Sequence, residues 1–573
     1  MTKEARYRLA DSTVAEPLVD GWPAWAQLIS PMPAALHLLN FQTFALSSYL
    51  EDPAAHVRAS RDPDLIGGPF VDIPPERAGE VRRLLDDMRG RRGAQLSLAR
   101  SFVDFHNWFV GEATGQSLEP YYAAVPEALR GYVELVYDYY NRPTVRLHEN
   151  LLYHGDYYDE TLQSFKLWRL ERDLSRTFFM STPRLPGEGE FDLRRPFADS
   201  SLDELFRMDV EPQPLGRVRE ALGLDASEES RLLPLLTTEP ASPPPPWEGD
   251  EVRVRYYGHA CVLIEWRGVS ILTDPFVGAV PAAGGMERFT YRDLPAHIDF
   301  ALVTHNHQDH FALETLLRLR HRVGHLVVPR NQGLLYGDMS LKLLTRRLGF
   351  ASVVELEPLE AIGFPGGEIV AVPFLGEHGD LAHSKAAYVV RAGRQQLLIA
   401  ADSDCLDREL YVKVRRALGP VETVFLGTES VGAPLSWGCG PLFPRKMQRA
   451  HEQGRRYHGS DAARGVELLE TIGARRVYNY AMGFEPWVEH LLGLGMTEDA
   501  PQYIESEKLL TRAAERGLLT AERLCGKTEF VIEESAAASP VAVAAAAPDG
   551  AHTGRPAAHE ADDARDAEDQ FAF

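Results

Sequence analysis

The sequence predicts a layered α/β protein in which a mixed α/β N-terminal domain precedes a larger domain of the αββα type. Three observations support this prediction: a run of prolines divides the chain, a β meander follows it, and strands then alternate with helical segments. At 573 residues the chain is too long for a single hydrophobic core. We therefore expect at least two domains.

The domain boundaries follow breaks in composition. Residues 239–248 contain a stretch of prolines, and proline fixes φ and removes the backbone donor, so this segment is expected to be a stiff linker. Residues 536–573 are rich in Ala, Asp, Glu, Pro and Gly, and such a composition cannot build a core. We expect an N-terminal domain at 1–238, a second domain at 249–535, and a disordered tail.

Two helices are expected in the N-terminal domain, over residues 76–89 and 160–177. The first begins just after Pro74 and Pro75 and stops at Gly90, where proline and glycine usually mark helix ends. The rest of this domain mixes short strand-like runs with many aromatic residues.

In the second domain, alternating apolar and polar residues indicate a series of strands. They are expected at 252–257, 261–265, 270–275, 325–329, 368–373, 386–391, 396–400 and 423–426. The first three form a meander, and helical patterns lie between several of the others. This order favours two sheets packed between helices.

The strongest functional signal is a cluster of metal-ligand side chains. His305, His307, Asp309 and His310 occupy six positions directly after the mostly apolar run 298–303. A strand that ends in such a turn can direct several side chains to one point and others to a second point nearby. Two-metal sites hold their ions about 3.5–4 Å apart. A polar loop that happens to contain histidines is the alternative interpretation.

Three motifs together resemble the metallo-β-lactamase superfamily over the whole second domain: Gly258-His259-Ala260, the segment 271–276, and His-x-His-x-Asp-His. The resemblance implies that the remaining ligands follow later strands. The fourth ligand position falls at 376–380, where either Glu377 or His378 could bind. The bridging carboxylate falls at 400–404, where Asp402 is the better candidate and Asp404 is more suited to a structural role.

The chain departs from the superfamily at the position of the final histidine. No histidine occurs in the segment 478–483, and His490, in an expected helix, is expected on the surface. With Glu377, Asp309 and Asp402 as ligands the site would be rich in oxygen donors, which suit iron or manganese better than a typical zinc site does. The missing histidine would also leave an open coordination position.

The pattern through 302–316, 376–380 and 400–406 is close to a narrower family, and the whole chain resembles the non-haem diiron aminoacyl β-hydroxylases of chloramphenicol biosynthesis. The resemblance implies a site of two Fe ions with six ligands, in which one iron is bound by His305, His307 and Glu377, the other by Asp309 and His310, and Asp402 bridges the two.

The reaction implied by this resemblance inserts one atom of O₂ at the β-carbon of an aromatic amino acid of the L-p-aminophenylalanine type. The amino acid is held as a thioester on a carrier domain of a nonribosomal peptide synthetase, in antibiotic biosynthesis. The sequence has no Gly-x-Gly-x-x-Gly fingerprint and no P-loop, so we expect the electrons to come from a separate reductase. The N-terminal domain is the candidate surface for docking the carrier or for forming a homodimer.

Composition argues against other classes of function. The formal net charge of -23 disfavours nucleic-acid binding, and no run of about 18 apolar residues predicts a membrane span. The N-terminus lacks a signal core, and the four cysteines are scattered, so we expect a cytoplasmic protein with reduced thiols. The basic clusters 318–322 and 445–456 are interpreted as solvated helix faces, with docking of an acidic partner or a phosphate as the alternative.

Two other functions compete with the oxygenase. A dinuclear zinc hydrolase, either a thioesterase or a lactonase, could use the same first motif to generate a metal-bound hydroxide. A degenerate fold that acts only as a scaffold would have no reason to keep Asp309 and Asp402 together. Dependence on O₂ separates the oxygenase from the hydrolase, and absence of bound metal would favour the scaffold.

Overall fold

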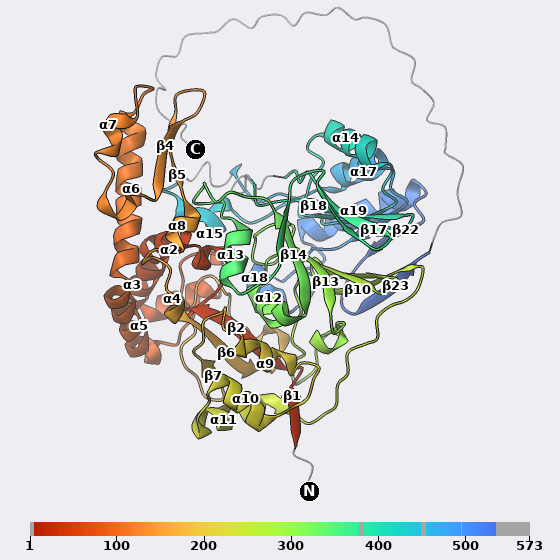
Figure 1. Ribbon diagram of the computed structural model, residues 1–573, viewed down its shortest axis with the longest axis horizontal. Helices are drawn as coiled ribbons and strands as arrows, with labels where there is room; N and C mark the ends of the chain where they lie inside the picture. The colour runs from red at the N-terminus through yellow and green to blue at the C-terminus, as the bar shows by residue number, and fades with distance from the viewer. Residues whose placement is uncertain (1–4, 377–382, 449–453, 494, 534–573) are drawn as a thin grey trace, which may run out of the picture.

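The computed structural model describes residues 5–376, 383–448, 454–493 and 495–533. In Figure 1 the first part of the chain, red to yellow, lies along the left and lower sides, and the green-to-blue part forms the sandwich on the right. Residues 238–251 contain no helix or strand and connect the two parts. The tail expected to be disordered, 536–573, lies outside the described residues. No helix among the described residues is long and apolar enough to cross a membrane.

The second part of the chain is a sandwich of two seven-stranded sheets, which confirms the expected αββα architecture. In the first sheet the order is β15-β14-β13-β12-β11-β10-β23. The neighbours from β12 to β15 pair in parallel and the others antiparallel. Its strands are β10 (Val252–Gly258), β11 (Cys261–Trp266), β12 (Val269–Thr273), β13 (Ile298–Leu302), β14 (Val323–Pro329), β15 (Val353–Leu356) and β23 (Thr528–Ile532).

The second sheet runs from β16 to β22 in sequence order and is antiparallel up to β19 and parallel beyond it. Each strand expected from the sequence occurs in one of the two sheets, within a few residues of its predicted bounds. The strands are β16 (Ala361–Phe364), β17 (Gly367–Val372), β18 (Ala387–Ala392), β19 (Gln395–Ala401), β20 (Thr423–Leu426), β21 (Arg476–Asn479) and β22 (Thr520–Arg523).

Strands buried on both faces hold the sandwich together. In β14, Val327 points into the core between the sheets, while Leu326 and Val328 pack outward against helices and the N-terminal part. This explains why residues 326–329 form a continuous apolar run rather than an alternating pattern. The outer helices are α12 (Leu313–Leu319) and α13 (Leu341–Arg347) beside the first sheet, and α14 (Arg408–Leu418), α17 (Ala462–Ile472) and α19 (Pro501–Glu515) on the second.

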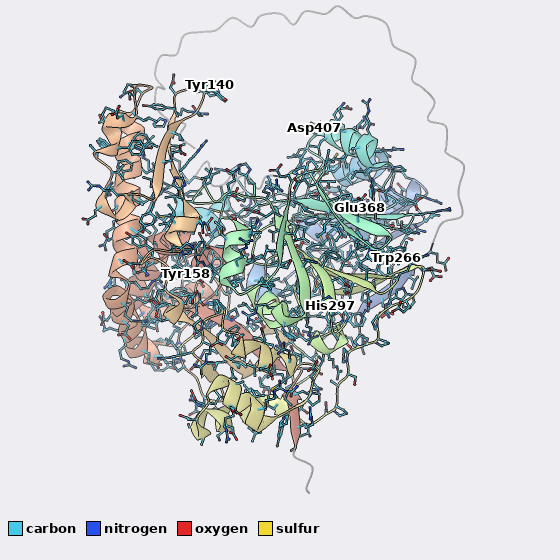
Figure 2. The ribbon with its side chains drawn as sticks, in the orientation of Figure 1. Tyr140, Tyr158, Trp266, His297, Glu368 and Asp407 are labelled. Atoms are coloured by element: carbon cyan, nitrogen blue, oxygen red, sulfur yellow. The ribbon has the colours of Figure 1, made fainter. Side chains whose placement is uncertain are left out.

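The N-terminal part combines small sheets with helices. Its strands are β1 (Arg6–Leu9), β2 (Thr13–Val19), β3 (Trp22–Pro23), β4 (Val133–Tyr137), β5 (Pro143–Leu147), β6 (Gln163–Arg169), β7 (Phe191–Leu193), β8 (Gln213–Pro214) and β9 (Leu236–Thr237). Its helices are α1 (Ala26–Ile29), α2 (Pro31–His37), α3 (Thr43–Glu51), α4 (Pro53–Ser60), α5 (Ala78–Arg91), α6 (Gly93–Glu112), α7 (Glu119–Tyr122), α8 (Glu149–Leu152), α9 (Ser201–Arg207), α10 (Leu215–Leu222) and α11 (Ala226–Leu232). In Figure 2, Tyr140 marks the tip of the β4–β5 hairpin, well away from the sandwich.

One of the two expected N-terminal helices is confirmed and the other is wrong. The helix predicted at 76–89 is α5, preceded by one turn of 3₁₀ helix. The longest element in the segment 160–177 is instead β6, which pairs antiparallel with β2. Phe165 and Leu167 face the core and are separated by Lys166, which is the two-residue period of a strand and not the period of a helix.

The basic segment 318–322 is not a solvated face, contrary to the sequence-based interpretation. Arg318 and Arg322 are each only 2% exposed. The Arg318 guanidinium donates to both carboxylate oxygens of Asp209 and stacks over the ring of Tyr291, with its central carbon 4.0 Å from the ring centroid. Arg320 pairs with Asp203 at 2.7 Å. Both aspartates belong to the N-terminal part, so these arginines join the two parts of the chain.

The Arg318 to Asp209 pair gives a stability prediction. Asp209→Ala should lower the free energy of unfolding by about 3–5 kcal/mol, because it leaves a buried guanidinium without its counter-charge. The matched control is Asp138→Ala, which removes a carboxylate that pairs with Arg142 on the exposed hairpin and should leave stability close to that of the wild type. Urea unfolding followed by circular dichroism measures both. Equal losses in the two variants would contradict the structural role of the buried pair.

Candidate metal centre

The site lies where several strands end at one edge of the sandwich. The loop after β13 carries His305, His307, Asp309 and His310, and the loop after β19 carries Asp402. His305 and His310 are fully buried. Ala401, directly before Asp402, has a φ of +48°, a left-handed conformation that costs free energy for a residue with a Cβ. This turn directs Asp402 from the second sheet toward the loop of the first.

The described structure brings five of the six predicted ligands together. His305 Nε2 lies 3.1 Å from His307 Nδ1 and 3.6 Å from Asp402 Oδ2. His310 Nε2 lies 3.0 Å from the same Asp402 oxygen and 3.8 Å from Asp309 Oδ2. Asp402 therefore sits between two groups of side chains. The sixth predicted ligand, Glu377, and its neighbour His378 lie outside the described residues.

A buried aspartate fixes the orientation of two of these histidines. Asp274 accepts the backbone N–H and the hydroxyl of Thr304, each at 2.7 Å, and lies 2.9 Å from His310 Nδ1. The Thr304 hydroxyl has one proton and donates it to Asp274. The Thr304 oxygen must therefore accept the hydrogen bond from His305 Nδ1, at 3.0 Å. Both imidazoles therefore carry their proton on Nδ1. Nε2 of each ring therefore faces the site, where it can bind a metal ion in place of a proton.

The electrostatics of the site favour a bound cation. Burial alone lowers the pKa of His310, but the carboxylates of Asp402, Asp309 and Asp274 outweigh burial and hold that pKa well above its ordinary value. Burial, together with the charges of Asp402 and Asp309, raises the pKa of Glu429 well above the usual range. The site thus carries an excess of buried negative charge, which a metal ion can balance.

Three residues near the centre were not assigned a role from the sequence. His259 Nε2 lies 3.0 Å from Asp309 Oδ2, and its backbone has a φ of +50°. Its Gly-His-Ala motif was noticed, but nothing local shows that it meets residue 309. Asp274 was visible only as a strand-end aspartate in the segment 271–276. Glu429 follows β20 at the same edge of the sheet as Asp402, which is the signal that could have identified it.

His490 and Asp404 lie elsewhere. The prediction that His490 is a surface residue is wrong, because it is only 6% exposed and its Nδ1–H donates to the carbonyl of Trp487 at 3.0 Å. It belongs to a short helix, α18 (Glu489–Leu492), packed against the N-terminal part. Asp404 is fully buried and pairs with Arg464 at 2.6 Å, so its carboxylate turns away from the histidine cluster.

The donor set fits two metal ions. Two groups of described residues each bring three ligand atoms within 4.8 Å of one another: His305, His310 and Asp402, and His259, Asp309 and His310. Imidazole mixed with carboxylate is a donor set that iron, manganese and zinc all accept. The two groups share His310, and Asp402 can face both positions.

Comparison with known proteins shows the family to which the chain belongs. Residues 8–240 match the model of the diiron non-haem β-hydroxylase N-terminal domain, and residues 253–388 match that of a β-lactamase superfamily domain. The 4-amino-L-phenylalanyl-(CmlP-peptidyl-carrier-protein) 3-hydroxylase of Streptomyces venezuelae is 36% identical over 526 residues, covering 91% of this chain and 98% of that protein.

Solved structures agree as well. The crystal structure of CmlA, a diiron β-hydroxylase from Streptomyces venezuelae, superposes with a TM-score of 0.85 at 34% identity, covering 92% of this chain and 100% of that one. A metal-dependent hydrolase from Desulfitobacterium hafniense is 43% identical, but over only 61 residues, 10% of this chain and 23% of that protein. The similarity to hydrolases is therefore local, whereas the similarity to the hydroxylase spans both parts of the chain.

Asp274 offers a test of the centre that leaves every predicted ligand intact. Asp274→Asn should weaken metal binding about 10- to 100-fold, because the groups that orient metal ligands contribute by that factor. Asp404→Asn is the matched control, since Asp404 is equally buried but bonded to Arg464. Metal content after dialysis against graded chelator measures the difference. If the Asp404 variant lost metal and the Asp274 variant did not, the orienting role of Asp274 would be wrong.

Proposed function

Because the chain belongs to the family of diiron non-haem β-hydroxylases, we propose that it hydroxylates the β-carbon of an aromatic aminoacyl group held as a thioester on a peptidyl carrier domain. The observation that supports this most directly is the 36% identity over 98% of a relative whose name states that activity. The substrate we propose is of the 4-aminophenylalanyl class, in the assembly of an antibiotic by a nonribosomal peptide synthetase.

Iron is the metal of this family, and we propose the ligands that the sequence suggests. His305, His307 and Glu377 would hold one iron, Asp309 and His310 the other, and Asp402 would lie between them. The 3.0 Å and 3.6 Å approaches of one Asp402 oxygen to His310 and His305 support the bridging position. His259 contacts Asp309, and we propose that it orients this carboxylate.

The chain's own residues prepare the site for this chemistry. When bound, the two irons supply oxygen activation, in which one atom of O₂ enters the β C–H bond and the other leaves as water with two electrons and two protons. Asp274 holds the imidazole protons away from the centre, as described above. Thr304, His305 and His310 are fully buried, and this burial excludes bulk water from the ligand side. Positioning of the substrate supplies a large share of the rate in such reactions.

The co-substrate and partners follow from this proposal. We propose O₂ as co-substrate and a separate reductase as the electron donor. The carrier domain would dock against the N-terminal part, which could also form a homodimer. The four cysteines are free thiols, three of them buried, which supports a reducing, cytoplasmic location. We also propose the domain division at 239–248, since the two family matches end at residue 240 and begin at residue 253.

Metal content and the visible absorption spectrum of the purified protein test the proposed function first. We expect about two irons per chain, oxo-bridged diiron absorption bands, and O₂-dependent hydroxylation of a 4-aminophenylalanyl carrier domain. About two zincs, a colourless protein and thioester or lactone hydrolysis without O₂ would instead establish the alternative, a dinuclear zinc hydrolase.

The choice between two adjacent residues tests the ligand set. Glu377→Ala should abolish hydroxylation and deplete iron, because it removes a proposed carboxylate ligand, whereas His378→Ala should keep most of the metal. Iron per chain and turnover are measured on both proteins, each variant serving as the other's control. An iron-depleted His378 variant beside an iron-replete Glu377 variant would show that the histidine is the ligand.

A further inference from the structure

A short segment of the second domain, residues 383–386, holds the backbone at the start of the ligand loop. It lies directly before β18 of the second sheet, whereas the ligand loop follows β13 of the first sheet. The N–H of Ala386 donates to the carbonyl of Thr304 at 2.7 Å, and Lys385 forms an antiparallel bridge with His305. The backbone of the proposed ligand His305 is therefore fixed from the opposite sheet.

Thr304 connects this contact to the orientation of the ligands. Its carbonyl accepts from the segment, while its hydroxyl accepts from His305 Nδ1 and donates to Asp274. The preceding residue is held in the same way, because the Tyr388 hydroxyl of β18 donates to the carbonyl of Val303 at 2.9 Å. All five residues are fully buried. Since packed interiors transmit displacements, a shift of the segment would reach the ring of His305.

The carboxylate of Asp338 holds this segment in place. Its two oxygens accept the backbone N–H groups of His383, at 2.6 Å, and of Ser384, at 3.1 Å. The Ser384 hydroxyl donates to the carbonyl of Met339 at 2.6 Å and accepts from the amide of Asn331 at 2.7 Å. Asp338 is only 1% exposed. Hydrogen bonds to an ionised acceptor are about twice as strong as neutral ones, so consecutive N–H groups on one carboxylate fix the segment firmly.

A second buried carboxylate, Glu149 of α8, ties the loop that carries Asp338 to the N-terminal part. It accepts the hydroxyl of Ser30, which precedes α2, and the backbone N–H of Ser340, which precedes α13, each at 2.9 Å. The loop approaches so closely that a Cβ on Gly333, whose φ is +67°, would lie 2.6 Å from a Glu149 oxygen. The two helices α8 and α13 are accordingly neighbours in Figure 1.

Two carboxylates in one buried region carry a free-energy cost. Burial, together with the charge of Asp338, raises the pKa of Glu149 to about 7. Each of the four carboxylate oxygens accepts a hydrogen bond, and such donors offset the lost hydration. Apolar side chains often fill such a space without this cost. The segments that they hold therefore explain these two carboxylates better than packing does.

We propose that Asp338 is a positioning residue for the metal ligand His305, and that Glu149 extends this positioning to the N-terminal part. Asp338 acts through residues 383–386 on Thr304, and so on the imidazole that must meet the metal. Because Glu149 holds the loop of Asp338 against the N-terminal part, the packing of that part sets the geometry of a metal centre in the second domain. The inference rests on the metal centre of the proposed function, but not on which metal or reaction it supports.

Cobalt(II) binding to the full-length protein tests this inference, because Co²⁺ accepts imidazole and carboxylate donors and its visible absorption reports the ligand geometry. Asp338→Asn keeps the size of the side chain but replaces one acceptor oxygen with a donor. We expect about tenfold weaker Co²⁺ binding, the lower end of the loss that orienting groups cause, and a shifted Co²⁺ band. Hydrogen exchange of the metal-free variant should be faster in peptides covering 300–306 and 383–392. A residue that only stabilised the fold would leave the spectrum of the folded, loaded protein unchanged.

Glu149→Gln tests the connection to the N-terminal part, and it is the milder variant if Asp338→Asn folds poorly. It should weaken Co²⁺ binding about threefold, the effect of one lost hydrogen bond. The double variant should bind Co²⁺ no more weakly than Asp338→Asn alone, because both residues act through one path. Losses that multiply would overturn the role of Glu149 in this path.

Asp138→Asn is the matched control. Asp138 also accepts two backbone N–H groups, from Tyr140 at 2.8 Å and from Arg142 at 2.9 Å, but it lies on the β4–β5 hairpin, away from the sandwich. Its variant should bind Co²⁺ with wild-type affinity and show the wild-type spectrum.

Wild-type Co²⁺ affinity and spectrum in both variants would overturn the inference. Weaker binding without faster exchange at 383–392 would also overturn it, because the effect would then not pass through this segment. The proposed function is judged separately, by iron content and carrier hydroxylation. A zinc hydrolase whose Asp338 variant shows the expected changes would refute the function alone. An active hydroxylase whose variants bind Co²⁺ as the wild type does would refute the positioning alone.

Discussion

The buried negative charge around His310 is the constraint on which the rest of the structure depends. Asp274, Asp402 and His310 are each less than 5% exposed, and the Asp309 side chain is 13% exposed. Carboxylates removed from water destabilise a fold unless cations or donors compensate them. The chain supplies donors to Asp274, but the oxygens of Asp309 and Asp402 meet imidazole nitrogens at distances suited to a shared metal ion.

Packing in the two-sheet sandwich offsets the free-energy cost of burying this charge. β13 and β19 belong to different sheets, and their ends meet because the sheets share one apolar core. Further apolar layers cover the outer faces of both sheets. Each layer contributes hydrophobic stabilisation that offsets the cost of the site. The left-handed backbone conformations of Ala401 and His259 also cost free energy. Such strain persists only where the surrounding packing enforces it, so the same apolar layers must offset this cost too.

The sequence predicts well what local patterns determine. The alternation of apolar and polar residues predicted the strands of the two sheets, and the proline run predicted the division of the chain. The close spacing of the ligand-type residues predicted the metal-ligand loop at 305–310. The failures share a physical cause, which is contact between residues distant in sequence. His259 meets Asp309 only through the fold, and Arg318 is buried only because Asp209 lies opposite it. Likewise, no local signal shows that His490 will be covered by the N-terminal part.

The N-terminal part is a structural component of the second domain, because the two parts pack against each other at a shared junction. One hydrophobic cluster contains Phe165 and Leu205 from the N-terminal part and Leu316 and Leu341 from the second. The two parts therefore share a core, and neither could lose the other without exposing apolar surface. Gln308, between His307 and Asp309, lines a pocket together with Trp25 and Phe179 of the N-terminal part. The ligand loop therefore borders this junction, and the shared core with its Arg318 to Asp209 pair keeps the junction rigid.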